Sequence, residues 1–286
     1  MNPKRSKLPA SLVLLLFAFV SIFPQIHGGG GGKAGIKEGL GSTWKGKGGT
    51  LISRLIQKKP VAASLGTSPR KRAPSPARPA APSAAAASIT FRPGQSTGVD
   101  LALANAFAST PAEKQTLIQL FTQLKQGYET EVAKEGKSNN LAAAMTFFIA
   151  SNVVAYHRTP MPSDEATEEL YIALRDTMSS TPEIAKLTNA EKQQMHDWLV
   201  YMGGFVLATY LEAVNTNDQE TLDNARLIAG YSTQIVLGID VAKITISDDG
   251  LSVSGGGTAS VKFQNFELVP DTNSSARIFG DQILAE

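Results

Sequence analysis

The chain offers few residues with which to do chemistry. It contains no cysteine, which excludes disulfides, thiolate metal sites and cysteine nucleophiles. Its histidines are His27, at the end of an apolar N-terminal segment, and His157 and His196, both in helical sequence. One alternative is therefore a hydrolase of unrecognised type that uses His157 or His196. Such an enzyme needs a cleft where a histidine and a carboxylate meet.

A metal site is the other chemistry that these histidines suggest. Two histidines from different helices could bind a metal together with a carboxylate such as Glu129, Asp164 or Asp197. The sequence lacks the HxxxH, HExxH and ExxH spacings that place such ligands on one helical face. We therefore expect no metal, no other cofactor and no catalytic residues.

The helices that would position these residues have clear starts. Thr110-Pro-Ala-Glu113 and Thr188-Asn-Ala-Glu191 each combine a capping hydroxyl with a glutamate at the third helical position, and Ser163 and Thr181 precede two further acidic first turns. The sequence predicts seven helices, over residues 99–108, 111–135, 140–157, 164–179, 182–187, 189–214 and 218–237. The fold class is therefore mainly α, a single helical bundle over residues 93–240.

The segment 140–157, NLAAAMTFFIASNVVAYH, is the expected centre of this bundle. It carries no Lys, Arg, Asp or Glu, and its apolar residues fall on every side of a helix, which is typical of a buried or a membrane helix. Thr146, Ser151 and Asn152 lower its hydrophobicity, and capped helices flank it. These features favour a buried helix in a soluble bundle.

Asn152, Tyr156 and His157 are the candidate pocket residues of this helix. A buried amide must find hydrogen-bond partners, and Tyr156 follows Asn152 one turn later on the same face. Asn152 could therefore face a ligand, or form a hydrogen bond to another helix that fixes their register. A histidine at a helix C-terminus is also suited to bonding nearby carbonyls.

Gly203 and Gly204 lie inside the long uncharged run of the 189–214 helix. Two glycines there cost about 1.5–2 kcal/mol relative to alanine. Close approach of another helix would offset this cost, and the alanine-rich segment 140–157 is the natural neighbour.

Residues 241–286 change to a short-strand pattern. Residues 241–246 and 251–254 alternate around Asp248-Asp249-Gly250 and predict a β-hairpin, and 259–269 predict a third strand with a bulge or kink. An isolated hairpin is marginal in water, so we expect docking on the bundle.

The N-terminal third differs in composition and charge. Residues 1–28 have the basic start and apolar stretch of a signal peptide. Residues 29–92 form a Gly/Pro/Ala-rich arm whose composition predicts disorder. Residues 1–92 hold fifteen basic residues and one acid, a net +14, whereas the remainder carries −12. A basic arm is thus joined to an acidic domain.

The helical segments also resemble a known family. The runs TPAEKQTLIQLF, NNLAAAMTFFIASNVVAYH, PSDEATEELY, TPEIAKLTNAEKQQM and GGFVLATYLEA are similar to exported bacterial proteins classed as a domain of unknown function, over roughly residues 96–240. The resemblance implies a helical domain behind a signal peptide and supplies no catalytic residues.

We expect an exported, non-catalytic binding or interaction module, periplasmic or extracellular. Its arm would bind an anionic envelope polymer or lipid surface through Arg and Lys, while the acidic domain argues against nucleic acid. A protein partner and a small-ligand or lipid pocket between the helices are alternatives. No transmembrane span is expected once the signal peptide is removed.

Overall fold

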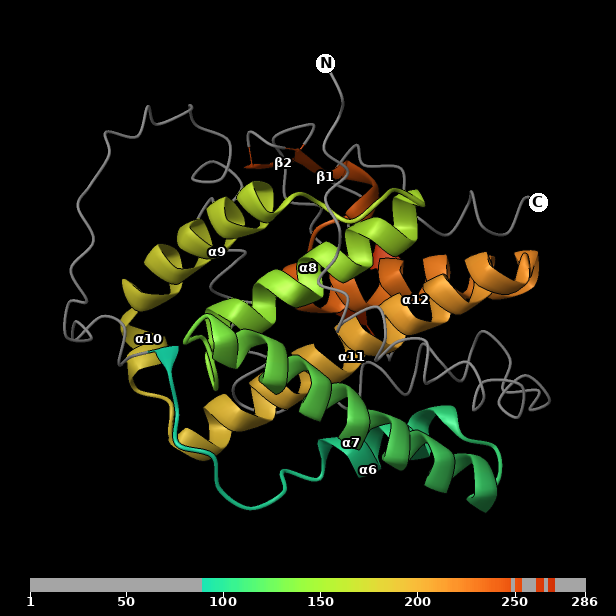
Figure 1. The fold of residues 1–286 in the computed structure, drawn as a ribbon, viewed down its shortest axis with the longest axis horizontal. Coiled ribbons are helices and arrows are strands. Elements are labelled where there is room, and N and C mark those ends of the chain that lie inside the picture. Colours follow the sequence, from blue (N-terminus) through green and yellow to red (C-terminus); the bar gives the residue numbers. More distant parts are fainter. Residues whose placement is uncertain (1–88, 248–249, 254–260, 265–266, 271–286) are drawn as a thin grey trace.

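The computed structural model describes residues 89–247, 250–253, 261–264 and 267–270 and confirms a mainly α fold (Figure 1). The predicted signal peptide 1–28 and most of the predicted arm lie outside the described residues. The helices are α6 (Val99–Phe107), α7 (Pro111–Lys134), α8 (Leu141–His157), α9 (Asp164–Ser179), α10 (Pro182–Ala185), α11 (Asn189–Thr216) and α12 (Gln219–Leu237).

Three of the four predicted helix caps are present. The hydroxyl oxygens of Thr110, Ser163 and Thr188 each accept a hydrogen bond from the backbone N–H three residues later. Thr188 forms a full capping box, since the Glu191 side chain accepts from its backbone N–H at 2.9 Å. Thr181 precedes α10 as predicted but does not cap it, because its hydroxyl donates to the Thr177 carbonyl at 2.8 Å.

Helix α8 is the buried centre of the bundle, as the sequence predicts. Every residue from 141 to 155 is buried except Phe147, which is half-buried. Figure 1 shows α8 crossing the middle of the molecule, and it packs against α9, α11 and α12. Asn140 caps the helix by accepting from the N–H groups of Ala142 and Ala143.

The predicted close approach at the paired glycines is also confirmed. A Cβ on Gly203 would lie 3.0 Å from the Phe148 Cα of α8, and one on Gly204 would lie 3.1 Å from Leu124 Cδ2 of α7. Gly203 lets α11 pack directly against the α8 backbone, and Gly204 leaves room for the Leu124 side chain of α7. This close approach offsets the helix-propensity cost of two glycines.

The packed domain begins before the expected boundary at residue 93. Ile89 and Phe91 are buried, Thr90 forms a β-bridge with Asn140, and the Phe91 N–H donates to the Asn139 carbonyl at 3.2 Å. Because Ile89 and Phe91 directly follow a proline- and alanine-rich sequence, composition alone assigns these two core residues to the arm. The first described residues therefore belong to the domain and not to the arm.

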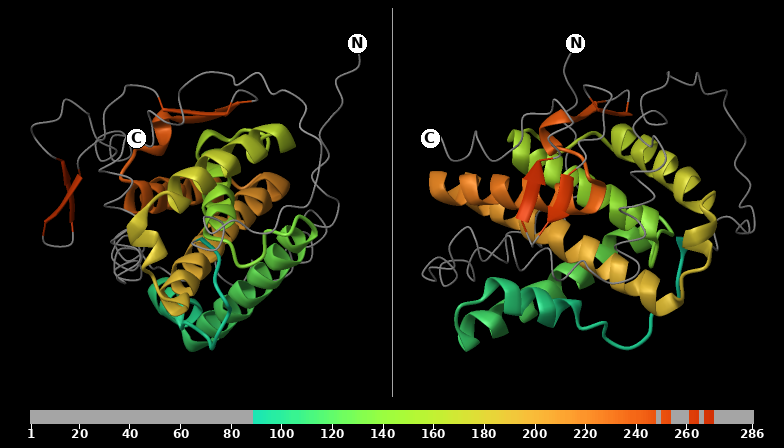
Figure 2. Two further views of the ribbon diagram at one scale, coloured as in Figure 1. Left: turned by 90° about the vertical axis from the view of Figure 1, so that its left-hand side faces the viewer. Right: turned by 180° about the vertical axis from the view of Figure 1, so that it is seen from behind.

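The predicted hairpin is present and docked. A 3-10 turn, Val241–Lys243, leads into β1 (Ile244–Ser247), which pairs antiparallel with β2 (Gly250–Val253). Ile244 and Leu251 are buried in the helical core, and the hairpin lies against α8 and α9 at one end of the bundle (Figure 2).

The single third strand expected over residues 259–269 is wrong in detail. The structure has two strands there, β3 (Val261–Gln264) and β4 (Glu267–Pro270), paired antiparallel with each other. The break in alternation near Phe263 and Phe266, interpreted as a bulge, therefore coincides with the change from one strand to the next.

Candidate functional site

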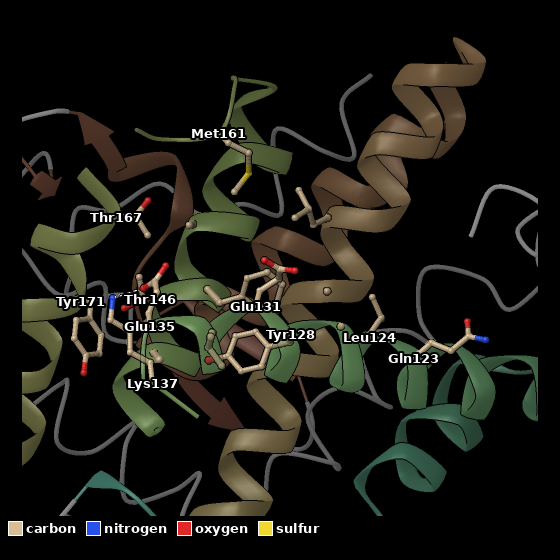
Figure 3. Close-up of a pocket in the computed structure, with 17 residues that line it drawn as sticks. Gln123, Leu124, Tyr128, Glu131, Glu135, Lys137, Thr146, Met161, Thr167 and Tyr171 are labelled. Atoms are coloured by element: carbon tan, nitrogen blue, oxygen red, sulfur yellow. Dashed lines mark hydrogen bonds and ion pairs between the residues drawn. The ribbon is translucent and has the colours of Figure 1, made fainter. Parts of the chain in front are cut away.

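A cavity of about 220 Å³ lies between α7 and α9, with its floor on α8 and α11 (Figure 3). We call it the α7–α9 cavity. Apolar and aromatic side chains form much of its wall: Leu124, Tyr128, Val132, Phe147, Met161, Tyr171 and Leu207. This is the usual character of a small-molecule site, mostly apolar with a few polar groups.

Small residues from three helices leave room for this cavity. Gly127 of α7, Ala143 and Ala150 of α8 and Gly204 of α11 all line it. The two alanines are buried, so the α8 surface is covered by neighbouring helices around a hollow instead of being open to solvent. The same glycine pair thus permits helix contact at Gly203 and forms part of the cavity wall at Gly204.

The polar groups gather at one end of the cavity. Figure 3 shows Glu135, Lys137 and Tyr171 together, with Gln123 and Leu124 at the opposite end. The Lys137 ammonium lies 2.6 Å from carboxylate oxygens of both Glu135 and Glu168 and 4.3 Å from the centre of the Tyr171 ring. These contacts raise the pKa of Lys137 despite the opposing effect of its partial burial, so the amine is charged at neutral pH.

Tyr128 is the unusual residue of the wall. Its side chain is buried, and its hydroxyl has no hydrogen-bond partner among the described residues. Burial raises the pKa of this phenol well above its ordinary value, and the charge of nearby Glu129 raises it further, so the hydroxyl stays protonated. This protonated hydroxyl is shielded from solvent and has a hydrogen bond still to donate.

Asn152, the first sequence candidate, lies in the core and not in a cavity wall. Its Nδ2 donates to the Phe148 carbonyl at 2.6 Å, and its Oδ1 accepts from Ser232 Oγ at 2.6 Å. The amide thus joins α8 to α12, which is the register-fixing alternative of the sequence analysis.

Tyr156 and His157 also have structural contacts. Arg226 lies over the Tyr156 ring, 4.7 Å from its centre. His157 Nε2 lies 3.1 Å from the Val241 carbonyl and 3.0 Å from the Ile244 carbonyl, tying the end of α8 to the start of the hairpin. His157 also lines a second cavity of about 470 Å³, beside the 159–163 segment and β1, which contains neither Asn152 nor Tyr156.

His196 lies in a separate group of polar side chains that we call the histidine cluster: His196, Glu129, Asp197, Lys125 and Thr97. His196 is fully buried, with Nδ1 3.3 Å from Asp197 Oδ1. Its Nε2 lies 3.0 Å from Glu129 Oε1, close enough for an ion pair although outside hydrogen-bond geometry. Asp197 also contacts Lys125 Nζ at 2.6 Å and accepts from Thr97 Oγ1 at 2.8 Å.

The protonation of this cluster follows from its contacts. Burial alone lowers the pKa of His196, but Asp197 and Glu129 outweigh it and the net shift is upward. Burial raises the pKa of Asp197, but His196, Lys125 and Thr97 outweigh it and the net shift is downward. The cluster therefore favours charged His196 and charged Asp197, and it joins α7, α11 and the segment before α6.

The hydrolase and metal alternatives required a histidine and a carboxylate in an open site. His196 does meet Glu129 and Asp197, two of the carboxylates considered, but it is buried and lines neither cavity described above. Within the described ranges, no group of three or more His, Asp or Glu residues is placed to hold a metal ion.

Residues 94–98, Gly-Gln-Ser-Thr-Gly, match the G-x-S-x-G pattern of hydrolase nucleophiles. Ser96 is exposed, its hydroxyl accepts from the Gly98 N–H at 3.2 Å, and it contacts no histidine in the described part of the chain. The neighbouring Thr97 is instead bonded to Asp197. The bond between Thr97 and Asp197 thus ties the segment before α6 to α11.

No sequence pattern directly predicts the α7–α9 cavity. Its walls come from four helices, and apolar spacing is the same whether a helix face meets another helix or a hollow. Gly127, a glycine inside the well-capped α7, is the one available signal, because such a glycine usually has a packing or functional reason.

Comparison with curated proteins and with solved structures finds no match. None of the helices in the described ranges is both long and apolar enough to cross a bilayer. The family resemblance expected over roughly residues 96–240 is confirmed and extends further in both directions, into the predicted arm and through the docked hairpin. The chain belongs to the family of unknown function DUF6683, whose model matches residues 55–254.

Proposed function

We propose that the helical domain is a non-catalytic binding module that holds a small, largely apolar ligand in the α7–α9 cavity. The observation that carries this proposal is the cavity itself, a mostly apolar hollow of about 220 Å³ that is partly open to solvent at the surface of the bundle. An engineered apolar cavity of about 150 Å³ is enough to bind benzene. An aromatic ring system or a short aliphatic chain is therefore the right size.

The construction of the wall supports ligand binding over simple loose packing. Protein interiors are close-packed, so a hollow of this size forgoes packing energy. Ala143 and Ala150 are positioned where larger side chains would fill the space, and Tyr128 places an unpaired hydroxyl beside it. A bound ligand would recover both the missing contacts and the missing hydrogen bond.

The test is binding of N-phenyl-1-naphthylamine, an uncharged apolar dye that fluoresces when it leaves water. Ala150→Leu would fill the cavity from its floor and should weaken dye binding at least tenfold. The matched control, Ala133→Leu, changes an exposed position of α7 outside the cavity and should bind as the natural protein does. Equal binding by both variants would contradict the proposal.

A second variant guards against loss of folding in Ala150→Leu. Thr167→Leu narrows the cavity from the opposite wall on α9, where the residue is only half-buried. It should weaken the dye as well, with the circular-dichroism spectrum of each variant confirming its helices. Normal dye binding by a folded Thr167→Leu would count against this site.

The basic arm supports a second part of the proposal, that an exported protein is held at an anionic surface. The carrying observation is the charge split between residues 1–92 and the rest of the chain. Cosedimentation with phosphatidylglycerol vesicles should require residues 29–88 and fall as salt rises, with phosphatidylcholine vesicles as the control. Binding that survives removal of those residues would rule out the arm as the tether.

A further inference from the structure

The charges around the α7–α9 cavity restrict what its ligand can carry at its polar end. Glu131 and Glu135 line the cavity, and Lys137 is the only basic residue in its wall among the described residues. Lys137 is already shared by Glu135 and Glu168, and Glu131 contacts Lys134 at 2.7 Å. The group as a whole therefore carries one more negative charge than positive.

An anionic ligand would have no unshared cation to meet here. To bind Lys137, a carboxylate would have to share the ammonium with Glu135 and Glu168, each 2.6 Å away, and approach both of their negative charges. It would also approach Glu131, whose side chain is only 14% exposed and is therefore weakly screened by solvent. A desolvated anion without a partner is strongly disfavoured.

A neutral or cationic group on the ligand would meet favourable partners in the same cavity. The carboxylates of Glu131 and Glu135 can accept from a hydroxyl or an amine, and the faces of the Tyr128 and Phe147 rings attract a cation. These two rings lie 5.2 Å apart and form part of the wall. The Tyr128 hydroxyl can in turn donate to a ligand oxygen.

We propose that the ligand of this cavity is an apolar molecule with an uncharged or positively charged polar end, an alcohol or an amine, and that carboxylates are rejected. This inference rests on the proposed function, since it assumes that the cavity binds a ligand. It adds the chemical class of the ligand's polar end. Charge arrangement of this kind sets specificity more than affinity.

The experiment is displacement of N-phenyl-1-naphthylamine from the full chain by octylamine, octanol and octanoate, at pH 7 and low salt. The three share one apolar chain and differ only in the polar end. Octylamine should bind at least tenfold more tightly than octanoate, with octanol between them. Octanoate binding as tight as octylamine would overturn the inference while leaving the proposed function intact.

Two variants locate the source of the selectivity. Glu131→Gln removes the least exposed carboxylate of the wall and should reduce the octylamine-to-octanoate ratio several-fold. Glu220→Gln, on an exposed position of α12 outside the cavity, should keep the ratio. An unchanged ratio in Glu131→Gln would overturn the charge argument. Failure of the dye to bind the natural chain would instead remove the proposed function, and this inference with it.

Discussion

Helix α7 serves two different regions on neighbouring faces. Half-buried Lys125 and Glu129 contact the histidine cluster, where they pair with buried Asp197 and His196. Leu124 and Gly127 face the α7–α9 cavity, where apolar groups surround a hollow. Tyr128 belongs to both surroundings, because its ring lies 5.6 Å from the His196 ring and also lines the cavity.

The comparison shows that the residues best suited to chemistry are used to hold the fold. The histidine cluster joins α7 and α11 to the segment before α6, and Phe91 of that segment also contacts His196 edge to face at 5.1 Å. The α7–α9 cavity, in contrast, has a mostly apolar wall, with its charged groups Glu135 and Lys137 at one end. His196 is thus kept apart from the α7–α9 cavity, whereas His157 lines the second cavity.

Among these variants, Asp197→Ala should have the largest effect on stability, because it removes a residue of the histidine cluster and none of the cavity wall. Asp197 is 1% exposed and contacts His196, Lys125 and Thr97, so its loss leaves the buried imidazole with Glu129 as its one remaining carboxylate among the described residues. We expect the free energy of unfolding in urea to fall by about 3–5 kcal/mol. Asp223→Ala, which removes an exposed ion pair with Arg158, should cost less than about 1 kcal/mol.

The outcome for the cavity separates the two regions further. At a temperature where Asp197→Ala remains folded, dye binding should stay near that of the natural chain, because Asp197 does not line the cavity. A loss of stability below about 1 kcal/mol would show that the cluster is not a stabilising network.

A smaller effect is expected at the crossing of α8 and α11. Gly203→Ala places a Cβ 3.0 Å from the Phe148 Cα, a backbone atom that cannot rotate away. We expect a net loss of about 1–3 kcal/mol in unfolding free energy, even though alanine favours a helix. Gly204→Ala should cost less, because its new Cβ meets the flexible end of Leu124. Equal effects of the two substitutions in urea unfolding would contradict this assignment.

The helix starts, the glycine pair and Asn152 show what the sequence could and could not predict. Helix starts depend on local hydrogen bonds, so Thr110 and Thr188 were sufficient to locate α7 and α11. The glycine pair predicted close packing because two helical glycines carry a cost that a neighbour must offset. Asn152 was correctly identified as buried, but only the position of Ser232, far along the chain, decides between a ligand and an interhelical bond.

The cavity could not be predicted in the same way. Whether Ala143 and Ala150 meet another helix or a hollow depends on where α7 and α9 lie, and that is set by contacts distant in sequence. Lys137 with Glu168, and Asn140 with Tyr171, are examples of such contacts. The arrangement of the histidine cluster depends on tertiary structure for the same reason, although its members Glu129 and Asp197 were recognised as candidates.

The pH dependence of the unfolding free energy tests the histidine cluster without any substitution in the cavity wall. The pKa of His196 is raised in the folded state by Asp197 and Glu129 against the effect of burial, with Lys125 of α7 the other nearby charge. Protonation of His196 therefore stabilises the fold below about pH 6.5, and this contribution is lost as pH rises through the folded pKa. Urea unfolding should show stability falling above pH 6.5, by at most about 1.4 kcal/mol per pH unit for this one group.

His196→Gln is the comparison for that measurement. Its stability, although lower, should depend less on pH between 6.5 and 8.5, whereas equal pH dependence would place the titration elsewhere. At the acid end, the pKa of Asp197 is lowered in the fold, so its contribution is present above about pH 3.8 and is lost as pH falls through the folded value.

The smallest and sharpest test is Tyr128→Phe, at the boundary between the two regions. Because the Tyr128 hydroxyl is buried without a partner among the described residues, its removal should leave unfolding free energy unchanged or raise it by about 1 kcal/mol. Octanol should bind several-fold more weakly, because the donor for its oxygen is gone. The matched control, Tyr231→Phe on α12, should leave octanol binding unchanged, since that residue lies outside the cavity.

A loss of stability in Tyr128→Phe with normal octanol binding would assign the hydroxyl to the histidine cluster. Unchanged stability with weaker octanol binding would assign the hydroxyl to the ligand. Tyr128 would then link the face of α7 that contacts the histidine cluster to ligand recognition in the α7–α9 cavity.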